Sequence, residues 1–281
     1  MPGTKFDAPR SLVSPNLVPV TFPRTHGEAS GIGIHVYYPW PPKTPPSRPV
    51  NGRTTRQIDT NETRPRFPPF PETSDAFDYV AGEAADAYPE GLVDQFTRHI
   101  LFAKPDVVII LAELRAPEPQ TFEWWLHSPE AMELNRQHDI RVSVGDAGAH
   151  VNMLVPEGLG LSQTDQFDPP PRERIQLTQW HLTAETSEPA NAMRFVTIIR
   201  PHREGEQPPT FAETELRDDY YAVRAKVDDG ELIAVWRLGP GEVTAMGLTT
   251  DGEVAAMRVS DDGEPGVYMV HEGTRVDFQG R

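Results

Sequence analysis

The chain of 281 residues has no cysteine, no long apolar run and fewer basic than acidic residues. Without cysteine it can form neither disulfides nor thiolate metal sites. No apolar stretch reaches the length that a membrane-spanning helix needs. The 26 basic and 42 acidic residues give a net charge of −16, which opposes phosphate backbones and anionic lipid heads. The sequence therefore predicts a partner that is neither a nucleic acid nor a membrane.

The N-terminal part is rich in proline. Half of the prolines, 15 of 30, fall before residue 72, and several are adjacent to one another. Proline cannot donate a hydrogen bond to a β-ladder, so residues 41–75 are expected to form an irregular loop with edge strands at most. Residues 1–25 lack the basic start and the apolar stretch of a secretory signal. Localisation is therefore left open between a cytoplasmic protein and a processed product.

From residue 76 onward the pattern is that of β-strands. Residues 107–111 (VVIIL) form an apolar run of strand length, and 141–144 and 149–154 alternate on either side of a Gly-Asp-Ala-Gly turn. After residue 218, Asp-Gly and Glu-Gly pairs recur between short strands. We therefore expect an all-β fold, a large antiparallel β-sandwich with an appended C-terminal β meander.

This pattern divides the chain into three parts: a proline-rich segment over 1–75, a sandwich core over 76–217, and a meander over 218–281 that closes over the sandwich or forms a small second sheet. Helix signals are few. The best ones are 128–135, where Ser128 and Pro129 resemble a capped first turn, and 210–216, which is rich in glutamate. Both predict short helices.

Several segments resemble one known family. Three β-type runs each carry a histidine, and four shorter motifs accompany them in the chain order that this family has: Phe96–Asp106, Phe122–His127, Gln179–Thr186, Tyr37–Trp40, Thr55–Gln57, Phe77–Val80 and Ser162–Phe167. Together they resemble the β-sandwich half of the heparinase II/III-like polysaccharide lyases. The resemblance covers roughly residues 30–202.

The resemblance implies a protein that handles uronate-containing glycans. Members of this family cleave such glycans by β-elimination, and an α-helical toroid preceding the sandwich holds most of the catalytic residues. Many members also hold a structural zinc with two histidines and an aspartate of the sandwich. Two of these ligand positions fall near Ile34 and Thr60 in this chain, so neither a metal nor any other cofactor is expected.

Five residues of the N-terminal part are candidates for glycan binding. Tyr37, Tyr38 and Trp40 form an aromatic cluster, and aromatic rings stack on the apolar faces of sugars. Arg56 can pair with a carboxylate. Asn61 lies beside the position where the family often has a histidine. Packing of the aromatic cluster against the sandwich is the competing interpretation, and the one that the sequence favours.

His99, His127 and His181 each lie within a β-type run. If neighbouring strands pair in register, the three imidazoles could converge on one sheet face. One interpretation is a three-histidine metal site. The other, which we favour, is a polar network of packed histidines and tryptophans. His99 and His127 are the candidates for catalysis if the chain carries any.

Three functions remain open from the sequence. The first is a lyase sandwich module that binds an acidic polysaccharide and needs an α-toroid partner for elimination. The second is a non-catalytic carbohydrate-binding or assembly protein derived from such a lyase. The possible protein partner is an α-toroid subunit or, by self-association, a second copy of the chain. The third is a compact lyase with a new site built from Tyr37, Tyr38, Arg56, His99 and His127. We expect the isolated chain to have little or no lyase activity, because a base, an acid and charge neutralisation must act together. Robust turnover by the purified chain would favour the third function instead.

Overall fold

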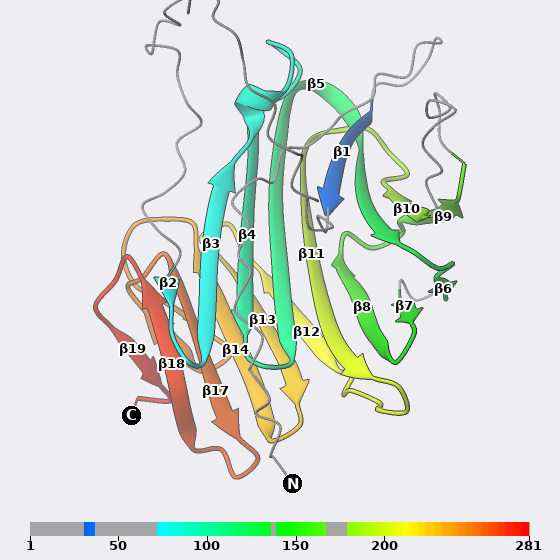
Figure 1. Cartoon of the computed structure of the whole chain (residues 1–281). Helices are drawn as coiled ribbons and strands as arrows, with labels where there is room; N and C mark the ends of the chain where they lie inside the picture. The colour runs from blue at the N-terminus through cyan, green and yellow to red at the C-terminus, as the bar shows by residue number, and fades with distance from the viewer. Residues whose placement is uncertain (1–30, 37–71, 136–138, 167–178, 281) are drawn as a thin grey trace, which may run out of the picture.

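The computed structural model describes residues 31–36, 72–135, 139–166 and 179–280. These residues are almost entirely β-strands, and the one helical turn among them is a 3₁₀ turn, Ala85–Ala87. None of the described segments is a helix long and apolar enough to cross a membrane. The strands form three sheets (Figure 1).

The large sheet has the strand order β2-β3-β4-β5-β11-β8-β7-β6. Its strands are β2 (Glu72–Thr73), β3 (Phe77–Glu83), β4 (Gln95–Ala103), β5 (Val107–Ser128), β6 (Glu133–Leu134), β7 (Asp139–Val144), β8 (Ala147–Val155) and β11 (Ala190–Arg203). Three further strands extend it beside the second half of β5: β1 (Gly31–Val36), β9 (Gly160–Thr164) and β10 (Trp180–Glu185). Of these, β1 runs parallel to β5 and β10 antiparallel to it.

The second sheet has the order β12-β13-β14-β17-β18 and the third the order β15-β16-β19. The second contains β12 (Ala212–Leu216), β13 (Tyr220–Val227), β14 (Gly230–Arg237), β17 (Val254–Ser260) and β18 (Pro265–His271). The third contains β15 (Val243–Ala245), β16 (Leu248–Thr250) and β19 (Val276–Phe278). Both sheets come from the C-terminal part of the chain, which therefore supplies the second layer of the sandwich.

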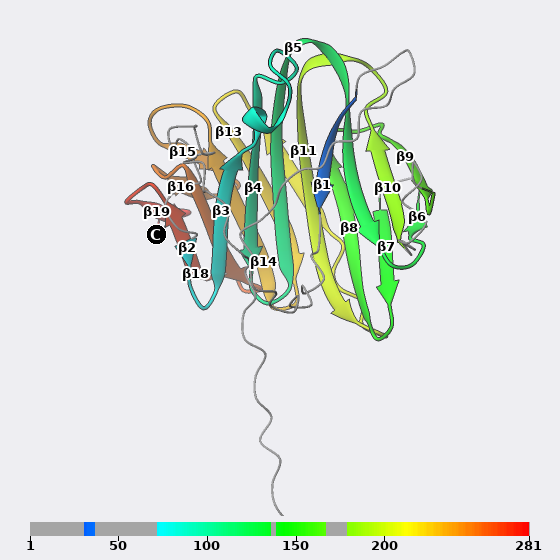
Figure 2. The same ribbon diagram turned by 45° about the horizontal axis from the view of Figure 1, so that its top comes forward.

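Strand β5 has 22 residues and changes its neighbours halfway. Its first half, up to Arg115, pairs with β4 and β11, whereas its second half pairs with β1 and β10. Pro117 and Pro119 lie between the two halves and cannot donate to a ladder, and the register of β11 shifts opposite them. Asn191 of β11 donates to the carbonyls of Ala116 and Pro117 there. The ribbon of β5 accordingly curves at this end (Figure 2).

Three apolar layers hold the sheets together. Between the large and the second sheet lie residues such as Leu101, Ile109 and Trp236, each at most 2% exposed. The opposite face of the large sheet buries Phe122, Trp124 and Phe195 under the curved half of β5. The third sheet covers the other face of the second. Residues alternate between these layers along each strand, as the period of two in a strand requires.

Gly230 shows how closely the strands of the second sheet approach. Its φ angle is +151°, and a Cβ atom at this position would lie 2.0 Å from the carbonyl oxygen of Val259 on the paired strand β17. Only glycine fits such an approach. The Asp-Asp-Gly turn read from the sequence therefore has a second function, which is to admit the neighbouring strand.

The structure confirms the all-β antiparallel sandwich. It shows that both helix predictions were wrong, because 128–135 contains the end of β5 and strand β6, and 210–216 contains β12. Strand β12 pairs with β13 over its whole length, and this pairing outweighs the helix propensity of its glutamates. The domain boundary expected at 217/218 falls between β12 and β13, which pair with each other. The division into domains stays a prediction. Of the proline-rich stretch 41–75, only residues 72–75 are described, and they contain the two-residue edge strand β2.

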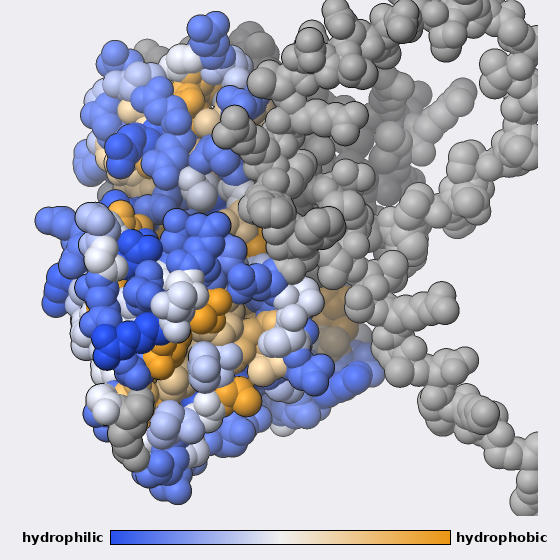
Figure 3. All heavy atoms as spheres, turned by 90° about the vertical axis from the view of Figure 1, so that its left-hand side faces the viewer, coloured by the Kyte–Doolittle hydropathy of each residue, from blue (hydrophilic) through white to orange (hydrophobic). Residues whose placement is uncertain are grey.

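Strand β18 forms one edge of the second sheet. Val267 and Tyr268 on this strand are 53% and 59% exposed. Seen from the side of β2 and β18, the described surface is mainly hydrophilic, with separate apolar areas (Figure 3). Exposed apolar residues are common on the surface of folded proteins.

The buried position of Phe195 predicts a large effect on stability. Replacing Phe195, which is 0% exposed, with alanine should lower the free energy of unfolding by about 3–5 kcal/mol, because a cavity remains under β5. Phe211 is 54% exposed, and the same substitution there should cost less than about 1 kcal/mol. Urea unfolding of both variants measures the difference. Equal losses would contradict the layer assignment.

Candidate functional site

The inner face of the large sheet changes from apolar to polar along β4 and β5. Leu101 and Leu111 pack against the second sheet, but the next residues on the same face are polar. We call this region the polar strip; it consists of Gln95, Thr97 and His99 on β4, Glu113 and Arg115 on β5, and Arg194 on β11. Direct cross-strand pairing aligns these residues: Thr97 with Glu113, Gln95 with Arg115, and Glu113 with Arg194.

His99 lies at the inner end of the polar strip, between a phenol and a carboxylate. Its Nδ1 is 2.8 Å from the hydroxyl of Tyr79 on β3, and its Nε2 is 3.7 Å from Oε2 of Glu113. The side chains of His99 and Glu113 are only 17% and 16% exposed. A carboxylate accepts and a phenol can donate, so in the neutral form of His99 a proton on Nε2 would face Glu113 and Nδ1 would accept from Tyr79.

Glu113 is also paired with an arginine. The Nε of Arg194 lies 3.5 Å from Oε1 of Glu113, and its guanidinium stacks over the ring of Tyr221 at 4.6 Å from the centroid. Burial alone raises the pKa of Glu113, but the hydrogen bond and charge of His99 and the charge of Arg194 outweigh it and hold that pKa below its ordinary value. Glu113 is therefore an ionised carboxylate at neutral pH.

Two tyrosines beneath the polar strip stay protonated. Burial, followed by the charges of Glu253 and Glu72, raises the pKa of Tyr79 well above its ordinary value. Burial raises the pKa of Tyr221 to about 12, although Arg194 acts in the opposite direction. At neutral pH both phenols can donate hydrogen bonds and neither can act as a base. The network of Tyr79, His99 and Glu113 thus orients an imidazole.

A shallow hollow of about 180 Å³ opens beside the polar strip. Its polar lining comes from Gln95, Glu113, Arg115 and Arg194, and its apolar lining includes Val155, Pro156 and Leu216. Sites for whole small molecules have volumes of about 300–1,000 Å³, so this hollow fits a single group of a larger ligand. Two guanidinium groups beside apolar walls suit a carboxylate attached to a ring that lies on the surface.

His127 and His181 form a separate pair. They lie directly opposite each other on β5 and β10, with ring centroids 5.0 Å apart. The side-chain amide of Gln179 donates to Nδ1 of His127 at 3.2 Å, and Trp125 stacks on its ring. Burial, and then the proximity of His181, lower the pKa of His127 to about 4. His127 is therefore neutral at physiological pH.

The three histidines do not converge on one site. His99 pairs with Leu111 in the first half of β5, whereas His127 lies in the second half, beyond the proline bend. A site shared by all three is therefore not formed, whereas the polar network of His127 with Gln179 and Trp125 is present. The catalytic roles of His99 and His127 stay predictions.

The other candidate residues from the sequence cannot be placed. Tyr37, Tyr38, Trp40, Arg56 and Asn61 lie outside the described residues. Their proposed contacts with a glycan therefore also stay predictions.

Sequence reasoning identified only His99 of the polar strip and missed Glu113, Arg115 and Arg194. The signal for two of them was present, because positions 109, 111, 113 and 115 read Ile, Leu, Glu, Arg. An apolar face that turns charged within one strand marks the end of a covering layer. Arg194 carried no such signal, because its place opposite Glu113 depends on the pairing of β11 with β5.

One further group of side chains lies close enough together to hold a metal ion. Within the described residues, Glu253, His271 and Glu272 each offer a ligand atom within 4.8 Å of the others. They lie where β17 begins and β18 ends, and no pattern in the sequence groups them. This cluster is separate from the positions at Ile34 and Thr60 that the family resemblance singles out.

Comparisons with known proteins give a likeness of structure only. No family model matches the sequence, and no curated protein matches it. Among solved structures, a heparinase III is similar with a TM-score of 0.48 and 13% identity, covering 60% of this chain and 27% of that chain. A heparan sulfate lyase from Pedobacter heparinus is similar with a TM-score of 0.45 and 12% identity, covering 62% and 27%. The matched part is thus about a quarter of each lyase, and at these values the likeness says nothing about activity.

The low pKa of His127 predicts a loss of stability in acid. The ordinary pKa of histidine in an unfolded chain is about 6.5. Between about pH 6.5 and 4, His127 binds a proton in the unfolded chain but not in the folded chain. The free energy of unfolding should therefore fall as the pH falls through this window. Denaturant unfolding at several pH values should show a shallower decline for His127→Gln than for the wild type. Parallel declines would mean that His127 is protonated in the folded state.

Proposed function

We propose that this chain is a β-sandwich module that binds uronate-containing acidic glycans through the polar strip, and that β-elimination requires an α-toroid partner. The observation that carries the proposal is the pair of guanidinium groups, Arg115 and Arg194, at a shallow hollow in an otherwise acidic protein. The sequence segments that resemble the heparinase II/III-like lyases support the choice of glycan.

The chemistry of the hollow favours a carboxylate on a sugar ring. Arginine pairs with carboxylates through two parallel hydrogen bonds, which fixes the orientation of the group as well as its charge. Within the described residues Arg115 makes no ion pair, and the side chain of Arg194 is 45% exposed although it pairs with Glu113. Both can therefore accept a ligand. The net charge of −16 opposes polyanions at longer range, which predicts weak binding. Salt screens this repulsion, and it also weakens the pairing of the two arginines with a carboxylate.

His99 is the residue of the polar strip best suited to proton transfer. Tyr79 and Glu113 hold its ring from both sides, as a general base or acid requires. Glu113, next to His99, is the one acidic residue among the described residues that line the hollow, and its neighbours keep it ionised. An elimination also needs an acid for the leaving oxygen, and a toroid partner would supply it.

Binding assays can test the glycan proposal. Titration with uronate oligosaccharides at low salt should show binding by the wild type, and Arg115→Ala and Arg194→Ala should each weaken it about tenfold, the value of one charge-assisted hydrogen-bonded pair. Arg203, whose side chain is 75% exposed on the far part of β11, provides the control. Arg203→Ala should bind as the wild type does. Equal weakening by all three variants would reduce the effect to general charge and overturn the proposal.

An activity assay separates the module from a compact lyase. The purified chain should produce no unsaturated uronate, detected by its ultraviolet absorbance, from heparan, chondroitin or alginate. Turnover by the chain alone that His99→Ala abolishes would contradict the need for a partner. Turnover that appears only when a toroid protein is added would support it.

A further inference from the structure

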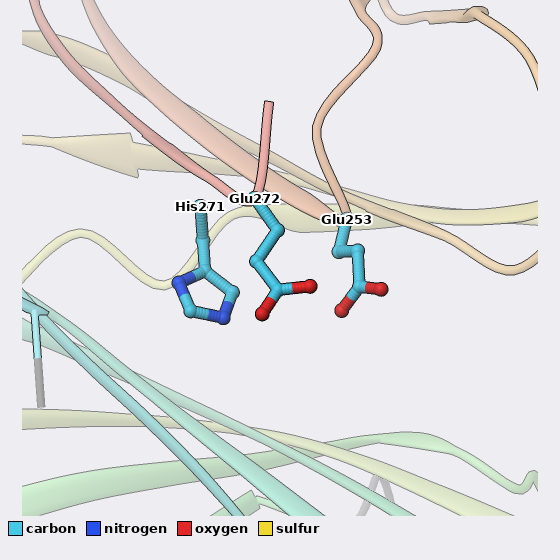
Figure 4. Close-up of side chains that lie close together, drawn as sticks. All are labelled: Glu253, His271 and Glu272. Atoms are coloured by element: carbon cyan, nitrogen blue, oxygen red, sulfur yellow. The ribbon is translucent and has the colours of Figure 1, made fainter. Parts of the chain in front are cut away.

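We propose that Glu253, His271 and Glu272 bind one divalent transition-metal ion of the Zn²⁺ type, with Glu72 as the carboxylate that orients the imidazole. The three side chains project into the same space from the second sheet (Figure 4). This site is separate from the polar strip, and the inference does not depend on the proposed function.

Backbone pairing places the three ligands together. His271 is the last residue of β18, Glu272 follows it, and Glu253 immediately precedes β17. The amide of Glu253 donates to the carbonyl of His271 at 2.9 Å, which ties the two chain segments at the level of the site. The arrangement is therefore part of the sheet and does not depend on a long loop.

The imidazole of His271 is oriented as metal-binding histidines are. Its Nδ1 is 2.8 Å from Oε1 of Glu72 on β2, which belongs to the large sheet. A histidine ligand almost always donates its second ring N–H to a carboxylate or carbonyl, which fixes the tautomer and leaves the other nitrogen for the metal. Figure 4 shows one ring nitrogen of His271 on the side of Glu272 and Glu253, and the other on the far side. Because Nδ1 bonds to Glu72, Nε2 is the nitrogen that faces the two carboxylates.

The carboxylates around His271 favour the binding of a cation. Three carboxylates, those of Glu72, Glu253 and Glu272, surround a single imidazole, and in the described part of the chain neither Glu253 nor Glu272 pairs with a lysine or arginine. Without a counter-ion these carboxylates repel one another, and a bound divalent ion removes the repulsion.

The ligand types decide which ion fits. Imidazole nitrogen is a good ligand for Zn²⁺ and its first-row neighbours, whereas Mg²⁺ and Ca²⁺ prefer oxygen alone. Ligand atoms about 2.1 Å from a tetrahedral Zn²⁺ are about 3.4 Å apart, so the three atoms must draw together from their present 4.8 Å limit. Both glutamates are exposed and can move that far by rotating about their side-chain bonds. Three protein ligands leave one position for water or another ligand.

The test is calorimetric titration of the full chain, freed of metal with a chelator, with Zn²⁺ and separately with Mg²⁺ and Ca²⁺. We expect one Zn²⁺ per chain and much weaker binding of Mg²⁺ and Ca²⁺. Glu253→Gln and His271→Gln should each weaken Zn²⁺ binding at least tenfold, and Glu72→Ala should weaken it about 10–100-fold through loss of the orienting hydrogen bond. Co²⁺ bound in the same place should give visible absorption bands that the His271→Gln variant lacks.

Control variants distinguish this site from binding elsewhere. Glu133→Gln and His202→Gln change an exposed carboxylate and another histidine outside the cluster, and both should leave Zn²⁺ binding unchanged. Circular dichroism of the metal-free variants should match the wild type, which shows that they fold. Absence of Zn²⁺ binding, equal binding by Glu253→Gln and the wild type, or a preference for Ca²⁺ over Zn²⁺ would each overturn the proposal.

Discussion

The structure depends on the way in which β5 is shared between two layers. A strand of 22 residues could not pair with the same neighbours throughout, because Pro117 and Pro119 interrupt its ladder. The strand bends there, and its two halves pair with different strands. The first half of β5 packs against the second sheet. The second half of β5 covers the apolar core on the opposite face of the large sheet. The polar strip begins just before this bend, where the large sheet leaves the cover of the second.

This position explains how charged residues come to lie on an inner sheet face. Burying an unpaired charge is costly, and Glu113 is only 16% exposed. Two partners offset that cost: His99, which faces one carboxylate oxygen, and Arg194, which faces the other. Tyr79 completes the network beneath them. This pairing stabilises the buried charge of Glu113, fixes the imidazole of His99 and leaves the guanidinium of Arg194 partly exposed. The same contacts therefore stabilise the polar strip and allow it to bind a carboxylate.

Net charge and local charge act at different distances. Screening at physiological salt confines electrostatic interactions between exposed groups to about 8 Å. An excess of sixteen negative charges therefore slows the approach of an acidic glycan, whereas Arg115 and Arg194 govern what happens on contact. The acidic cluster at Glu253 and His271 lies at the second sheet, and its carboxylates attract a cation rather than an anion.

Local patterns predicted the strands well and their neighbours poorly. The run at 107–111 is uniformly apolar and those at 141–144 and 149–154 alternate, and each of the three lies in a strand as the pattern predicted. Segment 210–216 was misread as helical because its glutamates favour a helix, whereas pairing with β13 decided its structure. The opposition of His127 to His181 followed from alternation and in-register pairing, but the separation of His99 from them depends on the bend in β5.

In both sites, too, local patterns indicate some of the residues but not their partners on distant strands. Alternation along one strand could have identified Glu113 and Arg115, whose charges replace the apolar residues of that face. Nothing in the local sequence linked Arg194 to Glu113, or Glu72 to His271, 199 residues apart. These pairs exist only because distant strands meet, and their partners could not be found without the topology.

Chemical-shift mapping tests most directly whether a uronate carboxylate binds at the polar strip. Backbone amide signals of the labelled chain would be followed during titration with a uronate tetrasaccharide at low salt. Among the described residues, we expect the largest shifts at 95–99 of β4, 113–115 of β5 and 192–194 of β11, and their loss in Arg194→Ala. Saturable shifts confined to the second and third sheets, with none at these three strands, would contradict the account.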